Sequence, residues 1–277
     1  MRTVGCIIAR TVSMRLPKKV LREINGKKMI EYIIEKMKHT RNLDDLYLCT
    51  SVDEKDKILL DVAKENNIKG YAGSRSSVID RMLDVAEIEN ADNVVRITGD
   101  NVFTDEFFLE RMIELHEDDP AVEYTRTEYL AQGVTSEVIK VSALKRCYEM
   151  MDPDQSEYLM GFIFDSEKFN CRVLIPEKAL QAEFCNLSVD TPADLERTQF
   201  LVDQLYKNGR IYYDDIIKLS KQMEIPHFEI DKDAPIKIPD NKTITYYEIR
   251  KKTMHPRIEK AQKIYLEDGF YENQRNS

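Results

Sequence analysis

The chain has 277 residues, of which 42% are hydrophobic and 33% are charged. This composition provides a buried core and excludes a chain that is disordered throughout. Forty-one Lys and Arg residues against 50 Asp and Glu residues give a net charge of −9, which argues against a protein that coats nucleic acid or an anionic membrane. We therefore expect a globular protein that binds neither nucleic acid nor a membrane.

The five cysteines are odd in number and scattered, with no C-x-x-C pair. This pattern resembles neither a disulfide framework nor a zinc site. The apolar run within residues 1–9 is too short for a signal peptide or a membrane span. We therefore expect reduced thiols and a cytoplasmic protein.

The N-terminal part of the chain alternates predicted strands with predicted helices. Residues 3–9 form an apolar run rich in β-branched residues, typical of a parallel strand covered on both faces. Helices are predicted at residues 27–39, 51–66 and 77–89. Each is followed by a predicted strand, at residues 46–50, near Tyr71 and at residues 93–98 respectively. This alternation predicts an α/β fold whose ligands bind at the carboxyl ends of the strands, in the loops after Ala9, Tyr71 and Thr98.

The second half of the chain is less regular, which predicts mixed strand pairing. Its predicted strands cover residues 121–125, 137–141, 171–175 and 184–189. Thr191 as N-cap and Pro192 as first residue then predict a helix to about residue 208. We expect a main domain over residues 1–208 and a C-terminal helical extension over 209–277, to which the sequence assigns no role.

The loop between Ala9 and Lys19 carries four cations directly after the first predicted strand: Arg10, Arg15, Lys18 and Lys19. Arg donates forked hydrogen bonds to phosphate oxygens and Lys supplies a movable charge, so this loop can wrap a polyphosphate. A solvated surface charge run is the alternative. Neither G-x-G-x-x-G nor G-x-x-x-x-G-K-[ST] occurs, so any phosphate is held by side chains.

A second candidate site follows the strand at residues 93–98, where Gly99 permits a turn and Asp100 projects a carboxylate. Mg²⁺ prefers one or two carboxylates together with phosphate oxygens of the substrate. Asp190, at the end of another apolar run, is a second candidate ligand. The alternatives are an ordinary Gly-Asp turn and an ordinary helix-entry aspartate. The four histidines lack metal-ligand spacing, and no G-x-S-x-G motif accompanies them.

These motifs together resemble the cytidylyltransferases that make CMP-activated sugar acids, with the spore-coat polysaccharide (SpsF-like) branch nearest, beside the CMP-Kdo and CMP-acylneuraminate synthetases. The resemblance covers roughly the first 205 residues, and the order and spacing of its segments match. The segments are IIARTVSMRLPKKVL, NGKKMIEYIIEKM, GSRSSVIDRML, VVRITGDNVFTD and LSVDTPADLE.

The resemblance implies a nucleotide-diphospho-sugar transferase fold, similar to GT-A and Rossmann folds, with three layers and a mixed central sheet. It implies transfer of CMP from CTP to a sugar acid or related small acceptor, with Mg²⁺ as cofactor, release of pyrophosphate and a role in surface polysaccharide or glycoconjugate biosynthesis. Matched by motif, the triphosphate loop is Arg10, Ser13, Arg15 and Lys19, the nucleotide side is Gly73, Ser74 and Arg81, and the metal ligands are Asp100 and Asp190. Arg10, Lys19 and Asp100 are the expected catalytic residues.

The acceptor side departs from the family pattern. Glu137 and Glu157 match expected substrate residues, but Thr135 stands where an Asp is usual, and the helix around Glu157 lacks the usual His, Thr and Pro. Val12 and Lys18 replace glycines of the loop. A GT-A glycosyltransferase and a catalytically silent nucleotide-binding protein are the alternative functions. The resemblance also predicts a homodimer, with apolar residues 162–169 as a candidate interface.

Overall fold

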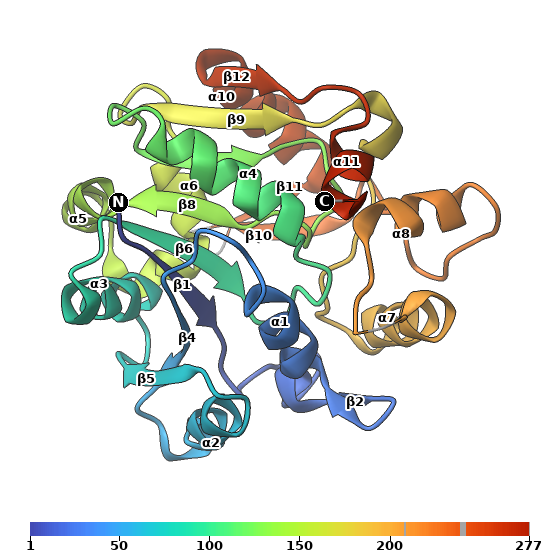
Figure 1. Cartoon of the computed structure of the whole chain (residues 1–277), viewed down its shortest axis with the longest axis horizontal. Coiled ribbons are helices and arrows are strands. Elements are labelled where there is room, and N and C mark those ends of the chain that lie inside the picture. Colours follow the sequence, from blue (N-terminus) through green and yellow to red (C-terminus); the bar gives the residue numbers. More distant parts are fainter. Residues whose placement is uncertain (208, 239–241, 277) are drawn as a thin grey trace.

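The centre of the protein is a mixed eight-stranded sheet. The computed structural model describes residues 1–277 except 208, 239–241 and 277 (Figure 1). In sheet order the strands are β12 (Gln262–Tyr265), β9 (Cys171–Ile175), β7 (Tyr124–Thr127), β8 (Glu137–Lys140), β6 (Asn93–Thr98), β1 (Thr3–Ile8), β4 (Asp45–Ser51) and β5 (Lys69–Gly73). β8 is antiparallel to both β6 and β7, whereas all other adjacent pairs are parallel. The predicted α/β class with a mixed sheet is confirmed.

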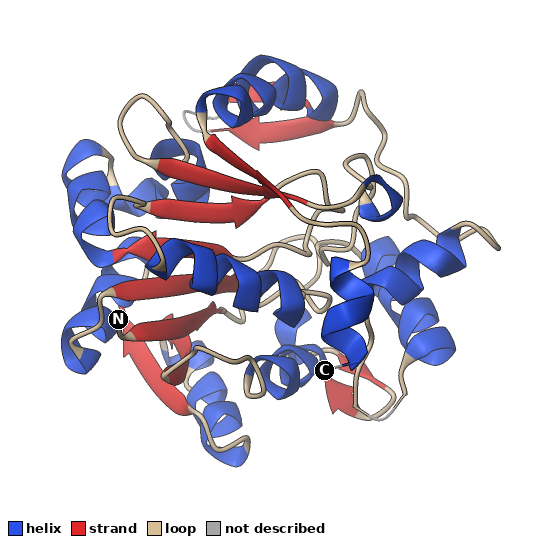
Figure 2. Ribbon diagram, turned by 45° about the horizontal axis from the view of Figure 1, so that its top comes forward, coloured by secondary structure: helices blue, strands red, loops and turns tan. Residues whose placement is uncertain are grey.

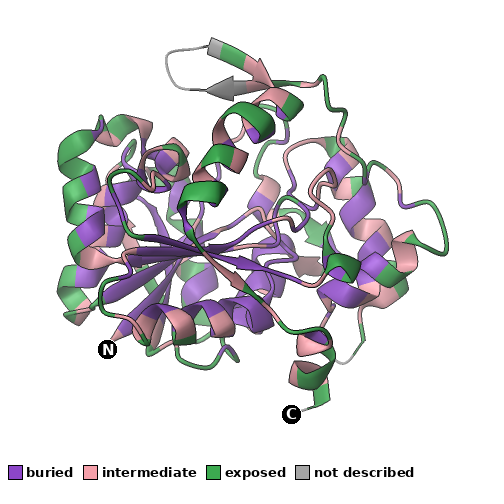
Figure 3. Ribbon diagram, turned by 90° about the horizontal axis from the view of Figure 1, so that it is seen from above, coloured by how far each residue is buried: buried purple, intermediate pink, exposed green. Residues whose placement is uncertain are grey.

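Helices cover both faces of the sheet and make three layers (Figure 2). One apolar cluster joins the sheet to α3 (Val78–Glu89), α5 (Val141–Met150) and α6 (Leu159–Ile163). The opposite cluster joins it to α1 (Met29–Met37), α2 (Ile58–Glu65) and α4 (Glu106–Glu117). Side chains of a strand alternate between the two faces, so Val4 and Cys6 enter the first cluster and Ile7 enters the second. Figure 3 shows the resulting burial of the sheet.

Two of the expected segments differ in the structure. Residues 184–189 do not form a strand; they make isolated bridges only, Gln132 to Asn186 and Cys185 to Glu229. The reason is that their backbone hydrogen bonds go to different neighbours: the N–H of Asn186 donates to Phe228 O at 2.7 Å, and that of Leu187 to Gln132 O at 2.7 Å. The segment therefore ties two loops together instead of extending the sheet.

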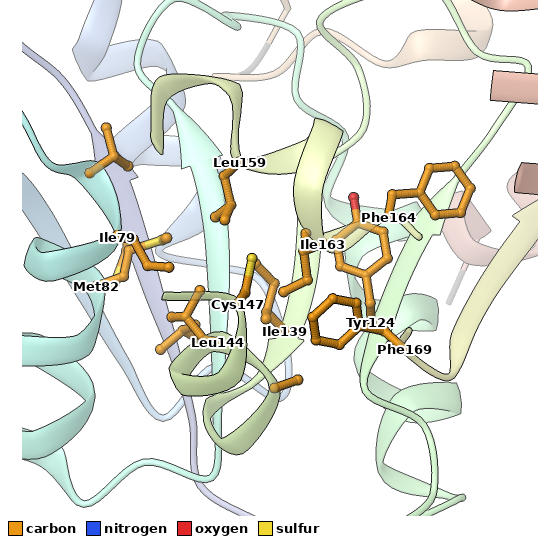
Figure 4. Close-up of a cluster of buried hydrophobic side chains, with 14 of the residues drawn as sticks. Ile79, Met82, Tyr124, Ile139, Leu144, Cys147, Leu159, Ile163, Phe164 and Phe169 are labelled. Carbon is orange, nitrogen blue, oxygen red and sulfur yellow. The ribbon is translucent and has the colours of Figure 1, made fainter. Parts of the chain in front are cut away.

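The apolar residues at 162–169 are also placed differently from the expected interface. Ile163, Phe164 and Phe169 are buried in the core, where Phe164 stacks on Tyr124 with ring centroids 5.6 Å apart (Figure 4). These three side chains are not available to a partner, whereas Phe162 is half-buried.

The C-terminal part contains strands as well as helices. After α7 (Pro192–Leu205) and α8 (Tyr213–Ser220), β10 (Pro235–Ile238) and β11 (Lys242–Thr245) pair as a hairpin. A continuous helical stretch follows: α9 (Tyr246–Ile249), a π-helix (Arg250–Met254) and α10 (His255–Lys260). β12 then joins the edge of the central sheet beside β9, and α11 (Phe270–Asn276) ends the described chain. No helix in the described part of the chain has the length and apolarity needed to cross a membrane.

Candidate active site

Lys19, Asp100 and Asp190 meet at the carboxyl ends of β1 and β6. Lys19 Nζ lies 2.5 Å from Asp100 Oδ2 and 2.8 Å from Asp190 Oδ1. The guanidinium of Arg15 lies 3.3 Å from the same oxygen of Asp190. Residues far apart in sequence therefore converge on one point, as expected for a ligand site at strand ends.

The loop that carries Lys19 is held in shape by its own contacts. The N–H and hydroxyl of Thr11 both donate to Asp56 Oδ1 at 2.7 Å, and the N–H of Lys18 donates to Thr11 O at 3.1 Å. Leu16 is buried, whereas Met14 at the tip is 90% exposed. Lys18, at a position where the resemblance implies glycine, adopts φ 54°, a left-handed conformation that glycine favours. The loop thus keeps the backbone geometry of a glycine without containing one.

Asp100 is positioned by a close approach of two strand ends. A Cβ added to Gly99 would lie 2.8 Å from the Cβ of Ala9 and 3.0 Å from the carbonyl oxygen of Ile8. Only a residue without a side chain lets β6 turn here against β1. The N–H of Val189 donates to Asp100 O at 3.0 Å, which fixes the segment that carries Asp190 beside Asp100.

Asp190 is held by the start of α7. Its N–H donates to Asp194 Oδ2 at 3.0 Å. Thr191 is the N-cap of α7, as the Thr-Pro signal predicted, and it forms a capping box with Asp194. Arg197, fully buried, donates to Ser188 O at 2.6 Å and to Asp194 Oδ1 at 2.8 Å. The side chain of Asp190 is thereby left free to face Lys19.

The electrostatics of this cluster favour a cation between the two carboxylates. Burial alone would lower the pKa of Lys19, but the charges of Asp100 and Asp190 outweigh it and raise the pKa above its usual value. No group of three or more His, Cys, Asp or Glu residues that could hold a metal occurs among the described residues. A pair of carboxylates fits Mg²⁺, which takes its remaining ligands from water and substrate phosphates.

The predicted nucleotide-side residues lie near Arg10 of the triphosphate loop. Arg81 is 1% exposed, its Nη1 has no hydrogen-bond partner in the described structure, and burial, followed by the charge of Arg10, lowers its pKa. A Cβ at Gly73 would lie 3.0 Å from Arg81 Cγ, so glycine leaves room for the arginine. Ser74 Oγ accepts from the N–H of Ser77 at 3.1 Å and so shapes the turn into α3.

Arg10 and Ser13 are the other two residues predicted for the triphosphate loop. Arg10 is exposed and donates to the carbonyl oxygen of Arg75. Ser13 is half-buried in the loop. The predicted site residues thus form two groups. One contains Lys19, Arg15, Asp100 and Asp190, and the other contains Arg10, Gly73 and Arg81.

The Lys19 cluster also borders a cavity of about 890 Å³. Lys19, Asp100 and Asp190 form one end of its lining, and both predicted substrate residues line it as well. Glu137 is buried at its floor and Glu157 is exposed. The volume lies within the usual range of small-molecule sites, roughly 300 to 1,000 Å³.

A chain of alternating charges connects the floor of this cavity to the C-terminal helical stretch. Arg96 binds Glu137 at 2.5 Å, Arg126 binds Glu128 at 2.8 Å, and Arg250 continues the chain with Glu128 at 3.0 Å and with Glu183 at 2.6 Å. Burial alone would raise the pKa of Glu137, but the charges of Arg96 and Arg126 hold it below its usual value. Glu137 is therefore an ionised member of an ion-pair network.

The sequence prediction missed three parts of this site. Asp56 anchors the triphosphate loop, but nothing in its local sequence marks it. Arg126 and Glu128 lie in and just after β7, and charged residues in a segment with strand character were the available signal. Arg250 comes from the C-terminal part, and no local pattern indicates that its helix returns to the sheet.

Known proteins match this chain over most of its length. The profile of the family described as cytidylyltransferase matches residues 4–213. An uncharacterised protein of Methanocaldococcus jannaschii, MJ1063, is 28% identical over 198 residues, which are 71% of this chain and 81% of that protein. The spore coat polysaccharide biosynthesis protein SpsF of Bacillus subtilis is 26% identical over 220 residues, 77% of this chain and 91% of that protein.

Solved structures of low sequence identity share the fold. A cytidylyltransferase from Leptospira borgpetersenii has a TM-score of 0.75 at 24% identity and covers 80% of this chain and 94% of its own. A CMP:2-keto-3-deoxy-manno-octonic acid synthetase complexed with CTP has a TM-score of 0.61 at 20% identity. The match covers 74% of this chain and 99% of that protein. With the profile matching most of the sequence, the chain belongs to the cytidylyltransferase family and is a CTP-dependent nucleotidyltransferase.

Proposed function

We propose that the enzyme transfers CMP from CTP to a hydroxyl of a sugar acid or related small acceptor and releases pyrophosphate, in the biosynthesis of a surface polysaccharide or glycoconjugate. The observation that carries this proposal is the position of the Lys19, Asp100 and Asp190 cluster. It lies between the basic loop on one side and the cavity of about 890 Å³ on the other. A reaction that joins a nucleotide to a second substrate needs such a junction.

In the proposed reaction, the acceptor oxygen forms a bond to the α-phosphorus of CTP while the bond from that phosphorus to the leaving pyrophosphate breaks. Phosphoryl transfer of this kind depends on in-line positioning and on neutralisation of charge. Lys19, Arg15 and Arg10 are the groups that would neutralise the triphosphate. The buried guanidinium of Arg81, whose Nη1 lacks a partner among the described residues, would donate to the nucleotide.

We propose Mg²⁺ as the cofactor, held by Asp100 and Asp190. When bound, Mg²⁺ would neutralise charge on the phosphate oxygens and orient the triphosphate. In the structure both carboxylates accept hydrogen bonds from the ammonium of Lys19. The positive charge of Lys19 therefore occupies the position that we propose for Mg²⁺. Lys19 carries four flexible methylene groups and can turn toward the phosphates when the metal takes its place.

The sugar-acid acceptor is supported by the relatives and by the cavity. The SpsF protein of Bacillus subtilis carries polysaccharide biosynthesis in its name, and a relative from Koribacter versatilis, 30% identical over 120 residues (43% of this chain, 44% of that protein), is a 3-deoxy-manno-octulosonate cytidylyltransferase. The half-buried Arg257 also lines the cavity, and its guanidinium can donate forked hydrogen bonds to the carboxylate of an acidic acceptor.

A homodimer and a cytoplasmic setting complete the proposal. Phe164 and Phe169 are buried, so they do not contribute to a dimer interface, and light scattering of the purified protein measures its mass directly. All five cysteines are unpaired, which supports a reducing compartment.

The experiment that tests the function measures pyrophosphate release. The protein is incubated with CTP, Mg²⁺ and a panel of sugar acids, and the CMP-linked product is identified by mass spectrometry. UTP and ATP in place of CTP measure base selectivity, and calorimetry measures CTP binding separately. The proposal predicts acceptor-dependent release with CTP. Absence of release with every acceptor, together with absence of CTP binding, would contradict it.

A further inference from the structure

The C-terminal part of the chain forms one wall of the cavity. We call this wall the roof. Eight residues of β10, β11 and the helical stretch that follows them line the cavity: Ile236, Ile244, Tyr246, Ile249, Arg250, Thr253, Met254 and Arg257. All eight lie beyond residue 213, where the match to the family profile ends. The roof is therefore built by a segment of the chain that lies outside the match to the family profile.

The roof carries an apolar patch beside its two arginines, Arg250 and Arg257, and faces charged residues of the floor. The floor residues Arg96, Arg126 and Glu137 are charged, and Thr127 Oγ1 is buried with no hydrogen-bond partner in the described structure. The apolar patch contains isoleucines, of which Ile236 and Ile244 are paired across the hairpin and half-buried. An occupant that satisfies both walls is polar on one side and apolar on the other.

The roof is fixed to the floor rather than loosely laid over it. Arg250 is 8% exposed and binds Glu128 of the floor at 3.0 Å and Glu183 at 2.6 Å. His255 Nε2 lies 2.6 Å from the same carboxylate of Glu183. Arg250 begins a π-helix within the helical stretch, a feature that occurs frequently at functional sites. The roof is thus a preorganised wall that sets the shape of the cavity.

On the basis of the proposed function, we propose that the roof selects an acceptor that carries a short apolar substituent, which packs against Ile236, Ile244 and Ile249. The hydroxyl and acidic groups of the same acceptor lie on the floor, and its reacting hydroxyl points toward Lys19, Asp100 and Asp190. The roof residues select the acceptor by its apolar group and take no part in the transfer itself.

The test measures binding of a homologous series of probes, separately from turnover. The probes are one sugar acid with N-acetyl, N-propanoyl or N-butanoyl groups, namely the N-acylneuraminic acids, together with its N-glycolyl form, which ends in a hydroxyl. Dissociation constants are measured by calorimetry in the presence of a non-hydrolysable CTP analogue. The proposal predicts that the dissociation constant falls by about fourfold for each added methylene until the cavity is full, and that the glycolyl form binds more weakly than the acetyl form.

Variants of the roof make the test specific. Ile244→Asn and Ile249→Asn should remove the gain per methylene and raise the KM of the acceptor while leaving kcat and CTP binding unchanged. Ile88→Asn is the matched control, because Ile88 is 57% exposed on α3, away from the cavity lining, and it should keep the full gain. Ile244→Thr provides a milder change if an asparagine variant does not fold.

Two outcomes would overturn the inference. One is an equal gain per methylene in the wild type and the roof variants; the other is failure of every probe to bind although CTP binds. The proposed function fails differently. Probes that bind with the expected gains, while CTP neither binds nor releases pyrophosphate with any acceptor, would leave the roof selective and refute the nucleotidyl transfer.

Discussion

The ammonium of Lys19 lies 2.5 Å from Oδ2 of Asp100, although the two residues are 81 positions apart in the sequence. Lys19 comes from the loop after β1 and Asp100 from the turn after β6, two strands that pair in parallel. This ion pair is the point where the side chains that would bind the triphosphate meet the side chains that would bind a metal. Changes at these residues therefore separate the two roles.

Asp100→Asn should lower kcat by at least about a hundredfold, the order of effect seen when a positioned electrostatic group is removed from an active site. The amide keeps the shape of the carboxylate but loses the charge that would hold Mg²⁺. Pyrophosphate release measures the rate, and circular dichroism verifies the fold. Asp61→Asn, exposed on α2, is the matched control and should keep wild-type activity. Wild-type turnover in Asp100→Asn would rule out the assigned role.

Lys19→Met should strengthen the binding of a divalent cation to the free protein, because it removes the ammonium that now occupies Asp100 and Asp190. We expect an increase in Mn²⁺ affinity of at least about tenfold, since a unit charge at 4 Å is worth several kcal/mol near a protein surface. The same variant should bind CTP more weakly. Electron paramagnetic resonance of free Mn²⁺ measures the first effect and calorimetry the second. Unchanged Mn²⁺ affinity would mean that the metal binds elsewhere.

The sequence predicted the nucleotide side better than the acceptor side, and the reason is physical. Lys19 and Asp100 follow β1 and β6, and their convergence follows from the rule that parallel strands end at one edge of a sheet. Asp190 follows no strand; it precedes α7, and the hydrogen bond from the N–H of Val189 to Asp100 O brings its segment to the same point. The confirmed Thr191 cap belongs to the same class of local signal.

The acceptor side depends on contacts between segments that are distant in sequence. Glu128 meets Arg250 across 122 positions, and no periodicity encodes such a pairing. The segment at 184–189 was predicted to be a strand because its apolar run has strand character, yet its backbone groups bond to two different loops. Tertiary hydrogen bonding overrode local propensity there.

Lys18→Gly should stabilise the protein by about 0.5 to 1 kcal/mol. A left-handed conformation costs an L-residue roughly 1 to 2 kcal/mol, and the greater freedom of glycine in the unfolded chain offsets part of that gain. Lys18 has φ 54° and is exposed, so the substitution removes no packing. Urea unfolding measures the change. Lys145→Gly, exposed in the middle of α5, should instead destabilise by about 1 kcal/mol; equal signs for both variants would contradict the argument.

Arg250→Met should destabilise the protein by about 3 kcal/mol, because Glu128 is 2% exposed and loses one of its two arginine partners. Adding Glu128→Gln removes the buried charge, so the double variant should lose less stability than the sum of the two single variants. Urea unfolding of all four proteins measures this coupling. Additive losses would show that Arg250 and Glu128 do not act as a pair.

Asp105 should make the stability of the protein depend on pH. Its side chain caps α4 by accepting from the N–H groups of Phe107 and Phe108, each at 3.0 Å, and it accepts a hydrogen bond from Tyr271 of α11. Burial, followed by the nearby charge of Glu106, raises the pKa of Asp105 to about 7. The folded protein then binds more protons than the unfolded chain between about pH 4 and pH 7. The free energy of unfolding therefore falls as the pH rises through that window.

Asp105→Asn removes this dependence, because an amide caps the helix without ionising and its N–H can donate to the hydroxyl oxygen of Tyr271. The difference in Tm, variant minus wild type, should increase between pH 5 and pH 8. The increase should be about 2 to 4 °C for each kcal/mol of unfolding free energy that the wild type loses over this range and the variant keeps. Asp118→Asn, exposed at the other end of α4, is the control and should show a constant difference. A difference that stays constant or narrows for Asp105→Asn would show that Asp105 is ionised in the folded protein throughout this range, with its charge stabilised by the N–H groups of the helix.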